Sequence, residues 1–176
     1  MNEFLRRSST VIAAVALFMA VTSPTAGASG GVSPDGTAAA SGAQGAFPVK
    51  ARYTYGDGLG AGRNHQGQDI LASCGKKVVA AQPGRVRVVD YQASGAGNFA
   101  VVKGKAYDTV YMHMLRRPVV KEGQRVQAGD VIGRVGSTGR STACHLHFEM
   151  WTAPGWYRGG AVEDPKPFLR RWARGD

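Results

Sequence analysis

Between residues 47 and 150, the apolar residues occur in short β-branched segments and not at the i, i+3, i+4, i+7 spacing of an amphipathic helix. Turn sequences such as Pro83-Gly84 and Lys103-Gly104 separate these segments. This pattern predicts an all-β fold, mainly antiparallel sheet, with little helix. The expected strands cover residues 77–81, 85–89, 98–102, 109–113, 125–126, 131–135 and 145–150, and one short helix is expected near residues 167–173.

The N-terminal part differs in composition from the rest of the chain. Arg6 and Arg7 precede an apolar stretch at residues 11–21, and Ala26-Gly27-Ala28 offers a cleavage site, so residues 1–28 are expected to be a signal peptide. Residues 29–46 are rich in Gly, Ala and Ser, which is typical of a flexible leader. Residues 47–176 have the length of one domain. The apolar stretch is shorter than the roughly 20 residues of a transmembrane helix, so we expect a secreted protein without a membrane span.

The chain is basic, with a formal net charge of +10. Removal of residues 1–28, which contain Arg6, Arg7 and Glu3, would leave +9. A charge of this size favours an acidic partner, and secretion points to an anionic polymer of the cell surface and not to nucleic acid. The alternative is that the charge serves only solubility. The basic residues are scattered, apart from an arginine cluster at 170–174, so no groove-reading helix is predicted.

Cys74 and Cys144 are the only cysteines. In an oxidising compartment such a pair most simply forms one disulfide. Closing a loop of about 70 residues would stabilise the fold by about 4 kcal/mol in the chain-entropy model. The alternatives are two free thiols, or one cysteine acting as a metal ligand. The ligand alternative is weakened because a strand at residues 145–150 would turn Cys144 away from His145 and His147.

Histidine is scarce in this chain, which contains four. Successive side chains of a strand alternate between its faces, so His145, His147 and Glu149 are expected on one face. His65 and Asp69 are close enough in sequence to act as a two-point chelate at a loop that enters a strand. Together with either histidine of the strand they form a set of two histidines and one carboxylate, which leaves an open position as in catalytic zinc sites.

The other histidines fit acid–base roles around such a metal. Zinc polarises a carbonyl group and lowers the pKa of its bound water to roughly 7. The remaining histidine of the 145/147 pair and His113 could then take the proton from this water and stabilise the developing charge. Alternation alone does not decide whether His145 or His147 is the ligand. An oxygenase iron site could use the same ligands, but secretion works against ferrous iron.

The chain resembles the lysostaphin-type zinc endopeptidases, which cut the peptide cross-links of bacterial peptidoglycan. The resemblance covers about residues 60–170 and is specific because an H-x-x-x-D segment, a tyrosine–x–histidine and an H-x-H segment follow in this order. It is carried by HQGQDI (65–70), VVAAQPGRV (78–86), GN (97–98), VYMHM (110–114), VQAGDVIGRVGSTGRSTACHLHFE (126–149) and EDPKPFL (163–169).

The resemblance implies a barrel-sandwich-like β domain with one zinc ion held by His65, Asp69 and His147. His145 would be the general base, and His113 would help to hold the water or the oxyanion. The implied partner is the peptide cross-link of peptidoglycan, so the protein is expected outside the cytoplasm at the cell wall, as a monomer that binds no nucleic acid.

Three further residues have two interpretations each. Asn98 could contact substrate or stabilise its turn, Glu149 could support the metal site or be a solvated edge residue, and Tyr55 could contact substrate, although packing is the simpler expectation. Two alternatives to an active enzyme are a non-catalytic activator of wall hydrolases and a carrier domain of the biotinyl or lipoyl type. The intact ligand set disfavours the activator, and the missing hairpin lysine disfavours the carrier.

Overall fold

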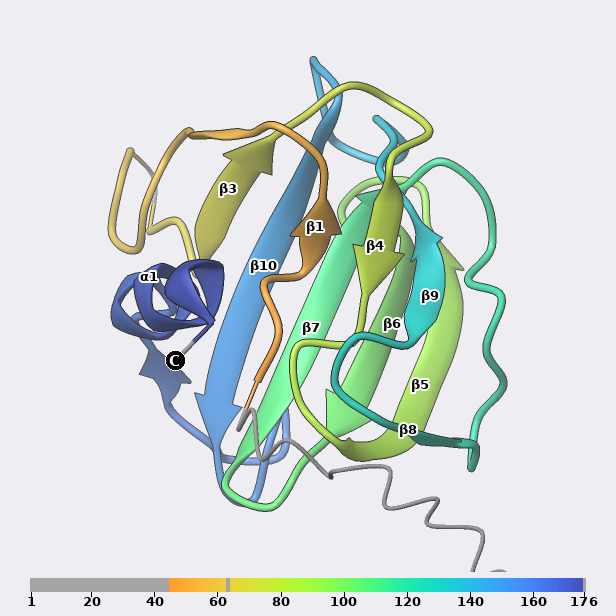
Figure 1. Ribbon diagram of the computed structural model, residues 1–176, viewed down its shortest axis with the longest axis vertical. Helices are drawn as coiled ribbons and strands as arrows, with labels where there is room; N and C mark the ends of the chain where they lie inside the picture. Colours follow the sequence, from red (N-terminus) through yellow and green to blue (C-terminus); the bar gives the residue numbers. More distant parts are fainter. Residues whose placement is uncertain (1–44, 63, 176) are drawn as a thin grey trace, which may run out of the picture. The chain divides into compact units, whose positions relative to one another are not determined.

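The computed structural model describes residues 45–62 and 64–175, which form two packed β-sheets and one helix (Figure 1). The predicted signal peptide and nearly all of the predicted leader lie outside the described residues. The strands are β1 (Val49–Lys50), β2 (Thr54–Tyr55), β3 (Gln68–Leu71), β4 (Lys77–Val79), β5 (Gly84–Gln92), β6 (Gly97–Lys103), β7 (Tyr107–Met114), β8 (Arg125–Val126), β9 (Val131–Arg134), β10 (His145–Thr152) and β11 (Val162–Glu163), and the helix is α1 (Lys166–Arg174).

All strand pairs are antiparallel, which confirms the predicted fold class. The large sheet has the order β2-β3-β10-β7-β6-β5-β8, and β11 pairs with β10. The small sheet has the order β1-β4-β9 and covers one face of the large sheet (Figure 1). Strands β10 and β7 are long and lie in the middle of the large sheet. They therefore hold their side chains rigidly on the face that the small sheet does not cover, which is called the uncovered face below.

The main core lies between the two sheets. Leu146, Phe148 and Met150 of β10 are fully buried there, together with Val78 of β4 and Ile132 of β9. A second, smaller cluster that includes Phe99 and Trp151 covers part of the opposite face of the large sheet. The alternation predicted for β10 is therefore confirmed, and it leaves His145, His147 and Glu149 on the face away from the main core.

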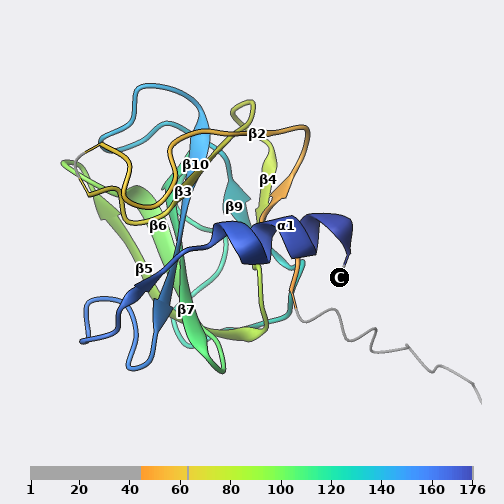
Figure 2. The ribbon, with the colours of Figure 1, turned by 90° about the vertical axis from the view of Figure 1, so that its left-hand side faces the viewer.

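Helix α1 closes one side of the core (Figure 2). It begins next to proline residues and ends at Gly175, whose φ of 85° gives the left-handed C-cap that glycine favours. Its buried residues, Leu169 and Trp172, belong to the main core, and the ring of Trp172 lies 6.3 Å from that of Phe148. The short helix expected near residues 167–173 is thus confirmed.

A disulfide and two contacts of residues 45 and 46 link segments that are distant in the sequence. Cys74 and Cys144 form a disulfide with a Cα–Cα distance of 5.2 Å, which confirms the predicted pairing. The backbone of Ala46 donates to the carbonyl of Ala81, and Gly45 lies directly against the ring of Trp172. These two residues, assigned to the leader from composition, therefore pack on the domain. No helix among the described residues is long and apolar enough to cross a membrane.

Candidate metal centre

The register between β3 and β10 creates the candidate metal centre. It places Asp69 directly opposite His147, and the loop before β3 brings His65 to the same point. The Asp69 Oδ1 atom lies 2.9 Å from His147 Nδ1 and 3.1 Å from His65 Nε2. Each of the three side chains offers one ligand atom, and these atoms lie within 4.8 Å of one another. The chemistry of this donor set, two imidazole nitrogens and one carboxylate, fits a zinc ion.

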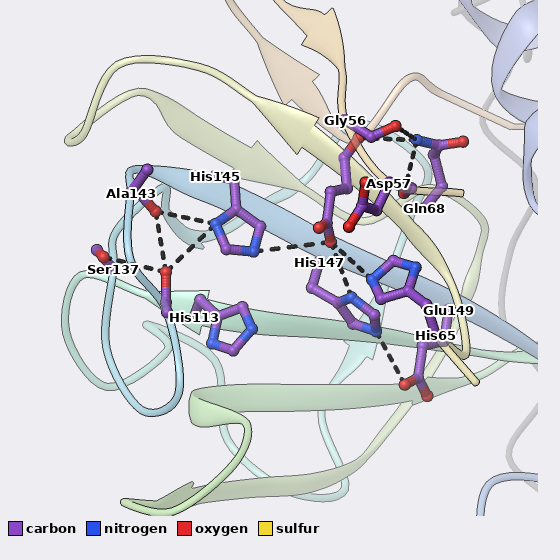
Figure 3. A network of polar contacts seen from close by, with 12 residues as sticks. Gly56, Asp57, His65, Gln68, His113, Ser137, Ala143, His145, His147 and Glu149 are labelled. Atoms are coloured by element: carbon purple, nitrogen blue, oxygen red, sulfur yellow. Dashed lines mark hydrogen bonds and ion pairs between the residues drawn. The ribbon is translucent and has the colours of Figure 1, made fainter. Parts of the chain in front are cut away.

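Hydrogen bonds behind the two histidines select the nitrogen that faces Asp69. His65 Nδ1 donates to the carbonyl of Gly58 at 2.9 Å, and His147 Nε2 lies 3.0 Å from Glu149 Oε1. These contacts leave His65 Nε2 and His147 Nδ1 toward the cluster (Figure 3). Partners of this kind fix the tautomer and orientation of metal-binding histidines in proteins.

The charges of the cluster are strongly coupled. Burial lowers the pKa of His147, but the hydrogen bonds to Asp69 and Glu149 outweigh it and raise this pKa to about 9. Burial raises the pKa of Asp69, yet the hydrogen bond from His147 and the nearby histidines lower it overall. Without a metal, His147 therefore carries a proton between two carboxylates. A bound cation would take the place of that proton.

His145 and His113 lie beside this cluster, with ring centroids 4.8 Å apart (Figure 3). His145 Nδ1 donates to the carbonyl of Ala143 at 2.9 Å, and its Nε2 lies 3.7 Å from Asp69 Oδ1. His113 Nδ1 donates to the carbonyl of Thr138 at 2.8 Å. Burial, only partly opposed by this bond, lowers the pKa of His113 to about 4. His113 is therefore neutral near pH 7, with a lone pair on Nε2.

A β-bulge in β7 turns His113 toward the site. Simple alternation would send His113 to the same side as Tyr111, which is buried in the main core. Instead, Asn98 pairs with Met114 and Ala100 with Tyr111, so β7 holds one residue more than β6 in this interval. The extra residue is accommodated at His113, whose φ is 63°. Bulges of this kind re-aim a side chain and are common beside active sites.

The five histidine and aspartate residues open into a cleft on the uncovered face of the large sheet. Its walls include residues of the loop before β3, the end of β5 with the turn that follows it, and the segment 139–142, together with Trp156 and Tyr157. Gln68 holds one wall in place, because its side-chain amide donates to the carbonyls of Gly56 and Asp57.

The structure brings together all five residues singled out from the sequence, His65, Asp69, His113, His145 and His147. Of the other three candidates, Asn98, Tyr55 and Glu149, only Glu149 is part of the site. Asn98 donates to the carbonyl of Met114 and does not line the cleft, and Tyr55 packs against Phe47 and Tyr53. Glu149 is 3% exposed and bonded to His147, so it is not a solvated edge residue.

Two residues of the site were not predicted. Trp151 and Trp156 both donate their indole N–H to Glu149 Oε2, at 2.7 and 3.1 Å. Trp151 could have been found from the sequence, since alternation places it on the same face of β10 as Glu149. Trp156 lies in the irregular segment after β10, where no periodic pattern indicates the direction of a side chain.

The chain is similar in sequence to curated endopeptidases. Glycyl-glycine endopeptidase ALE-1 of Staphylococcus capitis is 38% identical over 126 residues, which cover 69% of this chain and 34% of that protein. Peptidoglycan DD-endopeptidase ShyC of Vibrio cholerae is 40% identical over 87 residues, which cover 49% of this chain and 20% of that protein. The chain thus spans about a third or less of the length of these curated relatives.

Solved structures show the same fold. The antimicrobial peptidase lysostaphin from Staphylococcus simulans superposes with a TM-score of 0.63 and 32% sequence identity, over 74% of this chain and 56% of that one. The family model of peptidase family M23 matches residues 63–163. This range contains the central strands of both sheets and all five candidate site residues, His65, Asp69, His113, His145 and His147. The chain therefore belongs to peptidase family M23.

Proposed function

We propose that this protein is a secreted zinc endopeptidase that hydrolyses the peptide cross-links of bacterial peptidoglycan. The observation that carries the proposal is the arrangement of His145 beside the candidate metal ligands. Its Nδ1 is held by the carbonyl of Ala143, so in the neutral ring the lone pair of Nε2 points into the cleft, 3.7 Å from Asp69 Oδ1. A base in this position is what hydrolysis of a peptide bond by water requires.

The residues divide into metal ligands and proton carriers. His65 Nε2, Asp69 Oδ1 and His147 Nδ1 would hold one zinc ion, which when bound polarises the scissile carbonyl and lowers the pKa of water. His145 Nε2 accepts a proton from the attacking water and later delivers it to the leaving amine. His113 is neutral and its Nδ1 is committed to Thr138, so His113 Nε2 orients the water by accepting a hydrogen bond.

The test combines metal content with turnover. The purified protein should contain about one zinc ion per chain, and this ion should be removable by chelation. Incubation with peptidoglycan sacculi should release fragments whose new peptide termini are identified by mass spectrometry. These termini should be missing after chelation and in His145→Ala. Bound zinc without cleavage of any wall type would reject the enzyme and favour the non-catalytic activator.

We propose in addition that an anionic wall polymer binds a basic row on the small sheet. Lys50, Lys77 and Arg134 are exposed and lie opposite one another across β1, β4 and β9. These strands contain no acidic residue, and like charges in cross-strand positions destabilise a sheet. A polyanion such as a poly(glycerol phosphate) chain would relieve this repulsion.

A second basic row provides a matched control. Lys103, Arg85 and Arg125 are opposite one another across β6, β5 and β8, and all three are exposed. Changing Lys50, Lys77 and Arg134 to glutamine should weaken binding of the monomeric protein to poly(glycerol phosphate) by more than the same change in the second row. Equal losses would mean that only net charge matters, and tighter binding to duplex DNA at equal phosphate concentration would reject the wall polymer as the preferred partner.

A further inference from the structure

Glu149 is a buried carboxylate whose two oxygens have different partners. It is 3% exposed and lies on β10, two residues after His147. Its Oε1 lies 3.0 Å from His147 Nε2, whereas its Oε2 accepts the indole N–H groups of Trp151 at 2.7 Å and Trp156 at 3.1 Å. An indole nitrogen can only donate, so both tryptophans fix Oε2 as an acceptor. The side chain therefore cannot rotate without breaking three hydrogen bonds.

This arrangement determines which nitrogen of His147 carries a hydrogen. With Oε2 occupied by two donors, Oε1 of the carboxylate accepts the Nε2–H of His147. The lone pair of a neutral His147 ring is then on Nδ1, the atom 2.9 Å from Asp69 Oδ1. The orientation required for metal binding is consequently set by the carboxylate and, through it, by the two indoles.

Trp156 is itself held by an ion pair whose carboxylate is buried. Its backbone N–H donates to Asp108 Oδ2 at 2.9 Å, and its carbonyl accepts from Arg87 at 2.9 Å. Arg87 and Asp108 form an ion pair, and Asp108 is 3% exposed. Gly155 permits this contact, because a Cβ there would lie 2.2 Å from Asp108 Oδ2. The segment after β10 is thereby anchored to β5 and β7.

We propose that Glu149, Trp151 and Trp156 are positioning residues that hold His147 in the metal-binding tautomer, with the Arg87–Asp108 pair fixing Trp156. This inference rests on the proposed metal site. It adds a chain of hydrogen bonds that runs from β10 through the segment at 153–160 to β5 and β7 and supports the ligand His147. Supporting hydrogen bonds of this type usually change metal affinity by about 10- to 100-fold.

The test compares zinc affinity in three single variants of the full chain, measured by competition with a chelator. In Glu149→Gln the amide cannot accept both from the indoles and from His147, so zinc binding should weaken by roughly 10- to 100-fold. Trp156→Phe keeps an aromatic ring but removes one N–H donor, so a loss of about fivefold is expected. Trp172→Phe is the matched control, since Trp172 is 7% exposed in the main core and does not contact Glu149.

The visible spectrum of the cobalt(II)-loaded protein at saturation is a second readout. A change in the ligand geometry at His147 should alter the d–d bands of Glu149→Gln and Trp156→Phe, and leave those of Trp172→Phe unchanged. If both site variants bind zinc as tightly as the wild type and retain its cobalt spectrum, the positioning role is wrong. If the wild type binds no zinc, the proposed metal site fails instead. Should Glu149→Gln not fold, Trp156→Phe decides alone, because its ring remains to pack on Phe99.

Discussion

His145 and His147 are two residues apart on the same face of β10, yet their hydrogen-bond partners differ in a way that supports the different roles proposed for them. His147 is 7% exposed and bonded on both nitrogens to carboxylates, as expected of a ligand held in place. His145 is bonded only through Nδ1 to backbone and Ser141 oxygens, and its Nε2 is more distant from Asp69. Alternation along the strand did not distinguish these roles, which only the resemblance to a known family implied. The hydrogen bonds on the second nitrogen of each ring support the same division.

Replacing each of the two histidines by alanine should therefore separate metal binding from turnover. His147→Ala removes a ligand, so the purified variant should lose its zinc. His145→Ala keeps the three ligands, so it should retain about one zinc ion while turnover of sacculi falls by roughly 10²- to 10⁴-fold, the usual contribution of a general base. Metal analysis and fragment release measured on the same samples check this. Loss of zinc in His145→Ala would show that the assignment of ligand and base is reversed.

A buried phenol should make stability depend on pH at the alkaline end. The hydroxyl of Tyr111 is fully buried and is hydrogen-bonded to the Ala81 N–H at 2.7 Å and to the Thr109 hydroxyl at 3.0 Å. Burial raises the pKa of Tyr111 to about 12, although both hydrogen bonds oppose the shift. In the unfolded chain a tyrosine ionises near pH 10. Above pH 10 the unfolded state therefore binds fewer protons than the folded state, so the free energy of unfolding falls as pH rises. At pH 11 it should be lower by about 1.4 kcal/mol than at neutral pH.

Tyr111→Phe should remove this loss. At pH 7 the variant should be less stable by about 1–2 kcal/mol, because the buried Ala81 N–H is left unpaired. The difference between the two proteins should shrink between pH 9 and pH 11 in urea titrations. Tyr91→Phe is the control, since Tyr91 is 54% exposed. A difference between wild type and Tyr111→Phe that stays constant with pH would contradict the prediction.

At the scale of the elements, most strands were predicted from the sequence, including the two-residue strand β8 at 125–126, whereas β1, β2 and β11 were not. The segments expected at 85–89, 98–102, 109–113 and 145–150 lie within β5, β6, β7 and β10. Strands β1, β2 and β11 contain two residues each, too few to show an alternation, and they are strands only because of the neighbours with which they pair. The bulge at His113 escaped prediction for a related reason, since it depends on the register between β6 and β7.

The contact between β3 and β10 predicts a strong effect of one glycine. A Cβ at Gly67 would lie 2.4 Å from the carbonyl oxygen of Phe148, which is backbone and cannot move aside. Gly67→Ala should therefore push the start of β3 away from β10 and separate His65 and Asp69 from His147. We expect a loss of stability of roughly 1–3 kcal/mol together with weaker zinc binding, measured by urea unfolding and chelator competition.

Gly123→Ala is the control for this change. Gly123 has a φ of 81° with no atom near its Cβ position, so alanine there is strained but does not touch the site. It should lower stability, by roughly 1–3 kcal/mol, and leave zinc affinity unchanged. Unaltered zinc affinity in Gly67→Ala as well would mean that the β3–β10 spacing is not what brings the ligands together.

For the whole molecule, the fold class followed from the sequence but the sheet order did not. Alternation predicts strands and their buried faces, whereas the order β2-β3-β10-β7-β6-β5-β8 joins segments that are far apart in the chain. The candidate ligands illustrate this, since Asp69 and His147 meet only because β3 pairs with β10. The resemblance to a known family, and not local pattern, supplied this long-range information at the level of sequence.

The disulfide also joins segments that are far apart in the chain, like the pairing of β3 with β10. Its removal should lower the stability of the whole domain. Cys74 lies in the turn from β3 to β4, so the disulfide joins the connection between the two sheets to the start of β10, at a sequence separation of 70. The double variant Cys74→Ser/Cys144→Ser should lose up to about 4 kcal/mol of unfolding free energy, because the unfolded chain gains the freedom that the cross-link removes.

His65, Asp69 and His147 lie outside the loop of chain that the disulfide closes. Loss of the disulfide should therefore lower the stability of the domain without lowering its affinity for zinc. Urea unfolding of the wild type in reductant should match that of the double variant, and both should bind zinc in the folded state as the oxidised protein does. Addition of zinc should then raise their stability by an amount that depends only on zinc concentration and affinity. If the double variant is as stable as the oxidised wild type, the cross-link does not stabilise the domain. If it folds but no longer binds zinc, the start of β10 needs the disulfide to keep His145 and His147 in register with Asp69.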